Sequence, residues 1–206
     1  MMAVLAVVLA YLVGSFPTAY LVGRARGVNV FNVGSGNMGA TNVIRAVGVG
    51  YGVLVYALDG LKGIVAILLA RYLMPDHQLL ASMLAAIAVV AGHSWSLPAS
   101  LISGSVRGGK GAATASGTLI LLAPTLLLAL ALSIGALIVV LTRYVSLGVL
   151  TAVAVAGAGF LILVVVGTLQ PEYTLYLLVG WMIFVRHRSN IVRLITGTER
   201  RLGERA

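Results

Sequence analysis

The chain has 206 residues, of which 60% are hydrophobic and only 9% are charged, and its formal net charge is +9. Soluble domains are about a quarter charged. The composition therefore excludes an ordinary soluble protein and predicts an all-α integral membrane protein with one membrane domain, residues 1–206. Because the sequence has no cysteine, disulfides, thiol nucleophiles and cysteine metal sites are excluded. We attribute the positive charge to membrane topology and an anionic substrate, and expect no nucleic-acid partner.

Six apolar runs predict membrane helices, at residues 1–23, 51–73, 79–97, 112–141, 145–168 and 173–185. No basic residue precedes Arg24, so we expect the first run to be a retained helix and not a cleaved signal peptide. One spanning helix needs about 20 apolar residues. The run 112–141 is too long for one span and short for two, and Pro124 near its middle favours a turn there.

Charge asymmetry gives the expected topology. The links after the first, third, fourth and last runs contain Lys or Arg, whereas the links around Asp76 and Glu172 contain neither. The positive-inside rule places the basic links in the cytoplasm, with the N-terminus outside. All basic links share one side only if the run 112–141 crosses twice. We therefore predict about seven transmembrane helices, two of them short, with a cytoplasmic C-terminus. A six-helix protein with a re-entrant hairpin is the alternative.

The stretch from Gly34 to Arg45 predicts an anion-binding loop. Gly34, Gly36 and Gly39 match the dinucleotide fingerprint GxGxxG, but that fingerprint needs a soluble strand–helix unit, which this sequence lacks. Glycines can expose backbone N–H groups to an anion, and Arg45 offers a planar fork that suits phosphate. Short polar side chains add hydrogen-bonding groups: Ser35, Asn37, Thr41 and Asn42. The alternative is a flexible glycine loop that only joins two helices.

A second glycine-rich loop, residues 103–114, contains Gly104, Gly109 and Lys110 at the spacing of a nucleotide-binding P-loop. Gly111 stands where that motif needs Ser or Thr, so ATP binding is not favoured. Lys110 before a helix N-terminus remains a candidate anion ligand. The alternative is that Arg107 and Lys110 are topogenic charges that contact lipid headgroups.

Three further sets of polar residues stand out. His187 and Asn190 would share one helix face, with Arg193 close by, which suits substrate contact; a basic amphipathic tail is the alternative. Asp59 and Lys62 lie inside an apolar run and should pair, with either a structural or a catalytic role. We interpret His93 as a structural residue that ties the second loop down. The scattered histidines and carboxylates predict no metal site, and we expect no cofactor.

The motifs together resemble the bacterial acyl-phosphate-dependent glycerol-3-phosphate acyltransferases, the PlsY family. The resemblance runs in order through residues 14–21, 34–42, 59–63, 92–93, 108–114 and 187–194. It implies a multi-pass inner-membrane enzyme that transfers an acyl chain from acyl phosphate to the 1-hydroxyl of sn-glycerol 3-phosphate. The products are lysophosphatidic acid and phosphate, in the first acylation step of phospholipid synthesis. The sequence departs from the family pattern after Ser146, because Val149 replaces a small polar residue.

The resemblance also implies site residues and partners. Ser35, His187 and Asn190 are the expected catalytic residues, and His187 is the only plausible side-chain base, although a substrate phosphate oxygen could serve instead. Substrate binding is expected at Gly34, Gly36, Asn37, Thr41, Asn42, Arg45, Gly109, Lys110, Ser146 and Arg193. Supporting roles are expected for Asp59, Lys62, His93 and Glu199. Expected partners are the two substrates, membrane lipid and the enzyme that makes acyl phosphate. A transporter or a lipid-binding structural protein is the alternative.

Overall fold

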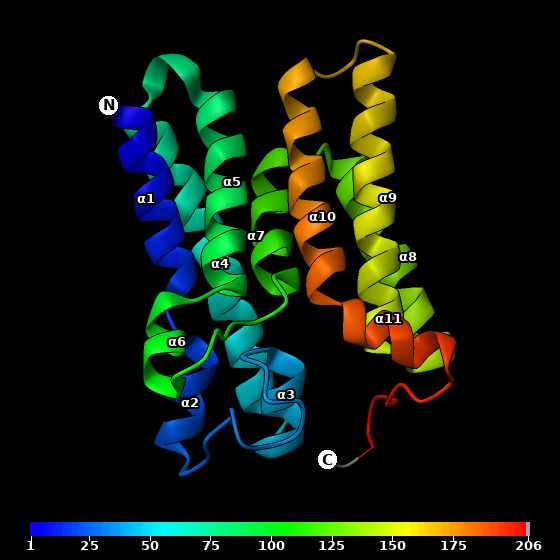
Figure 1. Cartoon of the computed structure of the whole chain (residues 1–206). Coiled ribbons are helices and arrows are strands. Elements are labelled where there is room, and N and C mark those ends of the chain that lie inside the picture. The colour runs from blue at the N-terminus through cyan, green and yellow to red at the C-terminus, as the bar shows by residue number, and fades with distance from the viewer. Residues whose placement is uncertain (205–206) are drawn as a thin grey trace. The chain divides into compact units, whose positions relative to one another are not determined.

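The computed structural model describes residues 1–204, and every regular element among them is a helix (Figure 1). Five helical stretches are long and apolar enough to cross a membrane: Met2–Ala25, Val49–Leu73, Pro75–Ser103, Thr125–Thr142 and Val145–Val165. This confirms the prediction of an all-α integral membrane protein. The count of seven spans and their orientation stay predictions. The chain divides into two compact units, residues 1–121 and 122–204, and the single membrane domain also stays a prediction.

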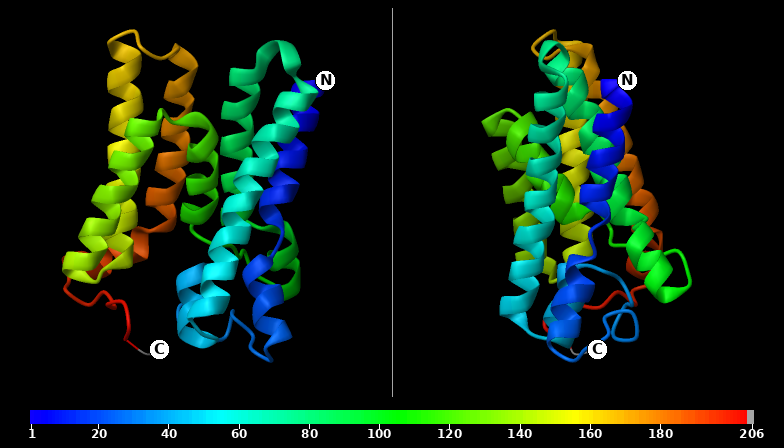
Figure 2. Two further views of the ribbon diagram at one scale, coloured as in Figure 1. Left: turned by 180° about the vertical axis from the view of Figure 1, so that it is seen from behind. Right: turned by 90° about the vertical axis from the view of Figure 1, so that its left-hand side faces the viewer.

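The first unit is built on three long helices that pack together (Figures 1 and 2). These are α1 (Met2–Ser15), α4 (Val49–Leu73) and α5 (Gln78–Ser94). Small residues allow the close approach: a Cβ at Gly14 would strike the backbone of Val89, and one at Gly92 would strike the backbone of Tyr11. Membrane helices commonly pack through such glycines. The remaining elements are α2 (Thr18–Ala25), α3 (Ala40–Ala46), η1 (Pro75–His77), α6 (Leu97–Ser103) and α7 (Ala112–Leu122).

The second unit contains α8 (Thr125–Thr142), α9 (Val145–Val165), η2 (Pro171–Leu175), α10 (Tyr176–Arg186) and α11 (Arg188–Ile195). Helices α8 and α9 meet where Gly135 and Gly148 face each other's backbone. The fully buried Phe160 of α9 packs its ring 5.5 Å from Tyr173 and 5.1 Å from Tyr176, measured between centroids. These aromatic contacts fix η2 and the start of α10 against α9.

Two prolines break the apolar runs. The break predicted at Pro124 is confirmed, because α7 ends at Leu122 and α8 begins at Thr125. Both halves were expected to be short, but only α7 is, with 11 residues, whereas α8 has 18 residues and is itself long enough to cross a membrane. The first apolar run is one candidate span, Met2–Ala25, but it is divided into two helices and does not form the single helix expected over residues 1–23. Phe16 has φ −56° and ψ 124°, the extended geometry that a following proline favours, and it separates α1 from α2.

Candidate active site

Asn42 organises the first glycine-rich loop, which lies between α2 and α3. Its Oδ1 accepts the Ser35 N–H at 2.9 Å, and its Nδ2 donates to the carbonyls of Val30 at 3.0 Å and Asn37 at 3.2 Å. The Asn42 side chain is buried, so these bonds are made away from water. An Asn amide that bonds nearby backbone groups in this way stabilises an irregular loop. We infer that Asn42 shapes the loop, whereas the sequence had predicted substrate contact.

Glycine is required at two of the three fingerprint positions. Gly34 and Gly36 have φ of 59° and 65°, in the left-handed region that side chains disfavour, whereas Gly39 has φ of −128°. The N–H of Gly36 donates to the Val33 carbonyl at 3.0 Å. The N–H groups of Ser35 and Gly36 are therefore engaged inside the loop and not offered to an anion. Exposed and half-buried side chains remain as candidate ligands: Ser35, Asn37, Thr41 and Arg45.

The second glycine-rich loop, between α6 and α7, is held against α5 and against the first loop. The Gly109 N–H donates to the His93 carbonyl at 2.9 Å, and the Met38 N–H donates to the Gly108 carbonyl at 3.4 Å. A Cβ at Gly109 would collide with the His93 ring. The His93 carbonyl and ring thus both contact this loop at Gly109, and the structural role of the His93 side chain stays a prediction. Both loops, and with them Arg45 and Lys110, belong to the first unit.

Asp59 and Lys62 form the ion pair that their spacing predicts. Lys62 Nζ lies 2.6 Å from Asp59 Oδ1, and the two side chains are 8% and 2% exposed. The same ammonium donates to the Phe16 carbonyl at 2.6 Å. Asp59 Oδ1 also lies 3.8 Å from Nδ1 of His93. The pair therefore connects the helix break before Pro17 with the residue that holds the second loop.

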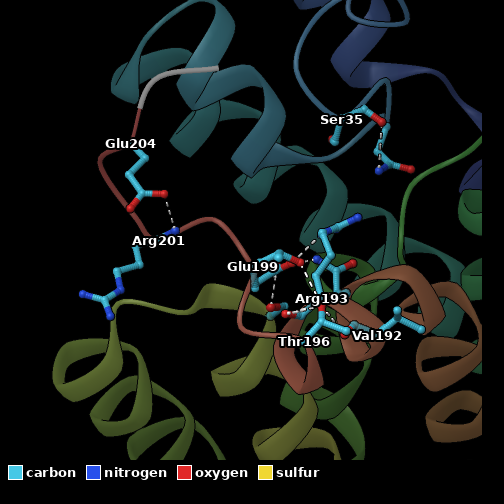
Figure 3. A network of polar contacts seen from close by, with 11 residues as sticks. Ser35, Val192, Arg193, Thr196, Glu199, Arg201 and Glu204 are labelled. Carbon is cyan, nitrogen blue, oxygen red and sulfur yellow. Dashed lines mark hydrogen bonds and ion pairs between the residues drawn. The ribbon is translucent and has the colours of Figure 1, made fainter.

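Glu199 is the centre of a hydrogen-bond network in the second unit (Figure 3). Its Oε1 accepts from Ser146 Oγ at 2.7 Å and from Asn190 Nδ2 at 2.6 Å, and its Oε2 accepts from Arg193 Nε at 2.7 Å. Burial opposes ionisation of this carboxyl, but the three donors together hold its pKa below the usual range. The Glu199 carboxylate is thus ionised at neutral pH and fixes three of the predicted site residues.

His187 precedes α11 and is buried, as is Asn190 one helical turn later. His187 Nδ1 lies 2.8 Å from the carbonyl of Ile183. Because a carbonyl only accepts, Nδ1 carries the hydrogen, and in the neutral ring Nε2 is then the nitrogen that can take up a proton. This geometry is suited to a general base or to a group that accepts a hydrogen bond from a substrate hydroxyl.

The predicted residues thus gather in two sets. The first set lies in the first unit, with Ser35, Asn37, Gly109 and Lys110 on the two loops and Thr41 and Arg45 on α3, which follows the first loop. The second set lies in the second unit and consists of Ser146, His187, Asn190, Arg193 and Glu199. Sequence reasoning missed the central position of Glu199, although an acidic residue inside an arginine-rich tail was a signal. It considered Arg107 only in the alternative that treats Arg107 and Lys110 as topogenic charges. That the two sets form one composite site stays a prediction.

Comparison with known proteins decides the family. A family model described as glycerol-3-phosphate acyltransferase matches residues 4–197. The chain belongs to the glycerol-3-phosphate acyltransferase family. It is 43% identical to a glycerol-3-phosphate acyltransferase of Thermus thermophilus, over 99% of this chain and 97% of the relative. It is 41% identical to that of Thermoanaerobacter sp. strain X514, over 100% of this chain and 98% of the relative.

Solved structures agree with this glycerol-3-phosphate acyltransferase assignment. The crystal structure of PlsY (YgiH), an integral membrane glycerol 3-phosphate acyltransferase, in its glycerol 3-phosphate form matches with a TM-score of 0.84 and 37% identity, over 98% of this chain and 96% of that chain. Its lysophosphatidic acid form matches with a TM-score of 0.82 and 36% identity, over the same shares of both chains. The resemblance noted in the sequence is confirmed, and the protein is an acyltransferase.

Proposed function

We propose that this acyltransferase moves an acyl chain from acyl phosphate to the 1-hydroxyl of sn-glycerol 3-phosphate at the bacterial inner membrane. The related PlsY structures contain glycerol 3-phosphate in one form and lysophosphatidic acid in the other, and these molecules differ by one acyl group. The observation that carries the proposal here is the pair of joined loops in the first unit, which bring Arg45 and Lys110 onto one glycine-rich framework. Cationic side chains held on such a framework suit a phosphorylated substrate.

The proposed chemistry needs little more than positioning. An acyl phosphate is a mixed anhydride with an activated carbonyl. The 1-hydroxyl oxygen of glycerol 3-phosphate attacks this carbonyl, the new ester bond forms, and the bond to phosphate breaks with its electron pair on the leaving oxygen. The hydroxyl proton passes to Nε2 of His187 or to a phosphate oxygen. Holding the reacting groups in place can supply much of the acceleration, so a covalent acyl-enzyme is not required.

Each unit has its own task in this proposal. In the first, Arg45 and Lys110 bind phosphate, because two anionic substrates repel each other and several cationic donors are needed to hold them. Ser35, Asn37 and Thr41 add hydrogen bonds. In the second unit, His187 and Asn190 orient substrate, and Glu199 holds Asn190, Ser146 and Arg193 in place. The donor is consumed in each turnover, so we also propose functional coupling to the enzyme that makes acyl phosphate.

We also propose that the protein crosses the membrane about seven times, with the N-terminus outside and the C-terminus in the cytoplasm. The five long apolar stretches and the shorter apolar helix α7 support this number, with α10, which has 11 residues, as the proposed seventh crossing. The links that lack Lys and Arg, around Asp76 and Glu172, support the orientation. With this topology both glycine-rich loops face the cytoplasm, where a phosphorylated metabolite is available.

Donor choice tests the function directly. Purified protein in detergent should release phosphate from palmitoyl phosphate only when glycerol 3-phosphate is added, with one lysophosphatidic acid formed for each phosphate. Palmitoyl-CoA should not support turnover, because the sequence shows no obvious site for the nucleotide part of CoA. Omitting glycerol 3-phosphate is the control for simple hydrolysis. Rapid acylation from palmitoyl-CoA without acyl phosphate would refute the proposed donor.

A further inference from the structure

Arg107 lies in the second glycine-rich loop, three positions before Lys110, and its backbone is firmly held. Its N–H donates to Ser100 Oγ at 3.0 Å, and its carbonyl accepts the Ser96 N–H at 2.9 Å. Ser96 begins α6 and accepts a capping bond from Ala99 N at 3.3 Å. Because α6 anchors both backbone groups of Arg107, the starting direction of its side chain is fixed.

The Arg107 side chain extends over the first glycine-rich loop. Its Cζ lies 5.7 Å from the centroid of the Phe31 ring. A methyl group added at Gly36 would lie 3.4 Å from Arg107 Nη1. Phe31 is itself buried and belongs to a hydrophobic cluster of the first unit. The guanidinium therefore lies against the loop that carries Ser35 and Asn37. A charge that only contacts lipid headgroups would not need this position.

The Arg107 guanidinium has an unsatisfied donor. Within residues 1–204, its Nε is buried and has no hydrogen-bond partner. Contact with the face of Phe31 is favourable for the positive charge, but the N–H groups lie in the guanidinium plane and cannot be satisfied by a ring beneath it. Buried donors in folded proteins almost always have a partner. An oxygen-rich ligand at the first loop would provide one.

We propose that Arg107 is a third phosphate-binding cation of the two loops, besides Arg45 and Lys110. Its Nε–H and one terminal N–H form a planar fork that matches two oxygens of a phosphate group. This inference rests on the proposed function, because it assumes substrates with phosphate groups. The phosphate belongs to glycerol 3-phosphate or to acyl phosphate, and kinetics with each substrate varied in turn distinguish the two.

The test uses full-length enzyme in phospholipid-free detergent, with the other substrate saturating in each series. Arg107→Gln should raise KM for one substrate about tenfold or more, the loss expected for one charge-assisted hydrogen bond, and should leave the other KM unchanged. Arg107→Lys keeps the charge without the fork, so it should recover part of the loss. Arg26→Gln is the matched control. It removes an arginine that also lies over a ring of the first unit, 5.0 Å from the centroid of Tyr51, and should leave both KM values unchanged.

A second variant separates ligand binding from simple stacking. Phe31→Leu removes the aromatic ring but keeps the guanidinium charge. If Arg107 only stabilises the contact between the two loops by stacking on Phe31, Phe31→Leu should reduce activity as much as Arg107→Gln does. That result would overturn the proposal. Normal KM values in both Arg107 variants would overturn it as well. So would a defect that arises only in vesicles containing phosphatidylglycerol, because it would identify a lipid headgroup as the ligand.

A binding measurement keeps this test separate from that of the proposed function. Glycerol 3-phosphate and inorganic phosphate should each raise the melting temperature of the wild-type protein, and Arg107→Gln should need about tenfold more of at least one ligand for the same shift. If the wild-type enzyme does not use acyl phosphate, the proposed donor fails, and this measurement still decides the role of Arg107. Equal ligand dependence in both proteins would exclude phosphate binding. If Arg107→Gln does not fold, Arg107→Lys takes its place, with a smaller shift.

Discussion

Glu199→Gln should weaken or remove the hydrogen bonds that hold three site residues: Ser146, Asn190 and Arg193. A glutamine has one carbonyl oxygen, so it cannot accept from Ser146 and Asn190 on one side and from Arg193 on the other. In the better orientation its oxygen keeps the first two donors and its NH2 group faces Arg193 Nε, donor against donor. Arg193 is 40% exposed and can turn to water, whereas Ser146 and Asn190 are buried. The substitution therefore removes one exposed charge-assisted bond and weakens two buried ones.

The size of the effect follows from these bonds. A hydrogen bond to a charged group contributes about 1.5–3 kcal/mol and a neutral one about 0.5–1.5 kcal/mol. Weakening the two buried bonds costs about 1–1.5 kcal/mol each, or about 2–3 kcal/mol together, and the bond to exposed Arg193 adds little. In a chain of this length that corresponds to a melting temperature lower by about 5–10 °C. Because Asn190 and Arg193 lose their support, kcat/KM should also fall at least about tenfold.

The stability that Glu199 contributes should decrease at low pH. The pKa of Glu199 is lowered in the folded protein, so its contribution to stability is complete above the unfolded pKa of about 4.3 and is lost as pH falls through the folded pKa. The difference in melting temperature between wild type and Glu199→Gln should be constant from about pH 6 to 8 and should shrink below about pH 4. Thermal unfolding in detergent measures it.

The control for this prediction is Glu204→Gln. Glu204 is exposed and accepts the backbone N–H of Arg201 at 2.9 Å, so its substitution should change the melting temperature little. A Glu199→Gln enzyme with wild-type stability and kinetics at pH 7 would refute the reasoning. A stability difference that persists undiminished at the lowest accessible pH would refute the electrostatic part.

The remaining predictions concern phosphate binding and topology. Arg45→Lys and Lys110→Arg should each lose about tenfold to a hundredfold in kcat/KM although the charge is retained, because a bidentate guanidinium and a compact ammonium are not interchangeable. Near-normal activity in both variants would mean that these charges serve membrane insertion only. Single cysteines at Asp76 and Glu172 should react with an impermeant reagent on intact cells, and one at Arg143 should not; labelling at Arg143 would contradict the double crossing at Pro124.

Local patterns in the sequence predicted local structure well. The spacing of Asp59 and Lys62 places both on one helix face, and charges inside an apolar segment must pair, so the ion pair could be predicted. Pro124 lies near the middle of the run 112–141, which is too long for one span, so the break there could be predicted. The break at Pro17 was missed because membrane helices tolerate proline and the first run has an ordinary length. The extended backbone of Phe16 shows that the helix is interrupted there.

Contacts between distant residues could not be predicted in the same way. Glu199 receives a hydrogen bond from Ser146, 53 residues earlier in the chain, and no spacing rule relates the two. Asn42 has the same amide whether it contacts a substrate or its own loop, and its bond back to Val30, 12 residues earlier, depends on the loop conformation. Arg107 was interpreted by its charge alone. Its orientation over Phe31 follows from the way α6 holds its backbone.

The break at Pro17 also explains the buried ion pair. Phe16 leaves the helical conformation before Pro17, so its carbonyl is turned out of the regular helix pattern and accepts from the Thr18 N–H at 3.0 Å and from the Lys62 ammonium. A lone ammonium inside an apolar segment would be costly, and Asp59 offsets its charge at 2.6 Å. The Lys62 ammonium therefore donates two hydrogen bonds within the protein, to the Phe16 carbonyl and to the Asp59 carboxylate. Asp59 in turn lies near His93, whose carbonyl holds Gly109. We infer from these contacts that Asp59 and Lys62 position the second loop and do not contact substrate.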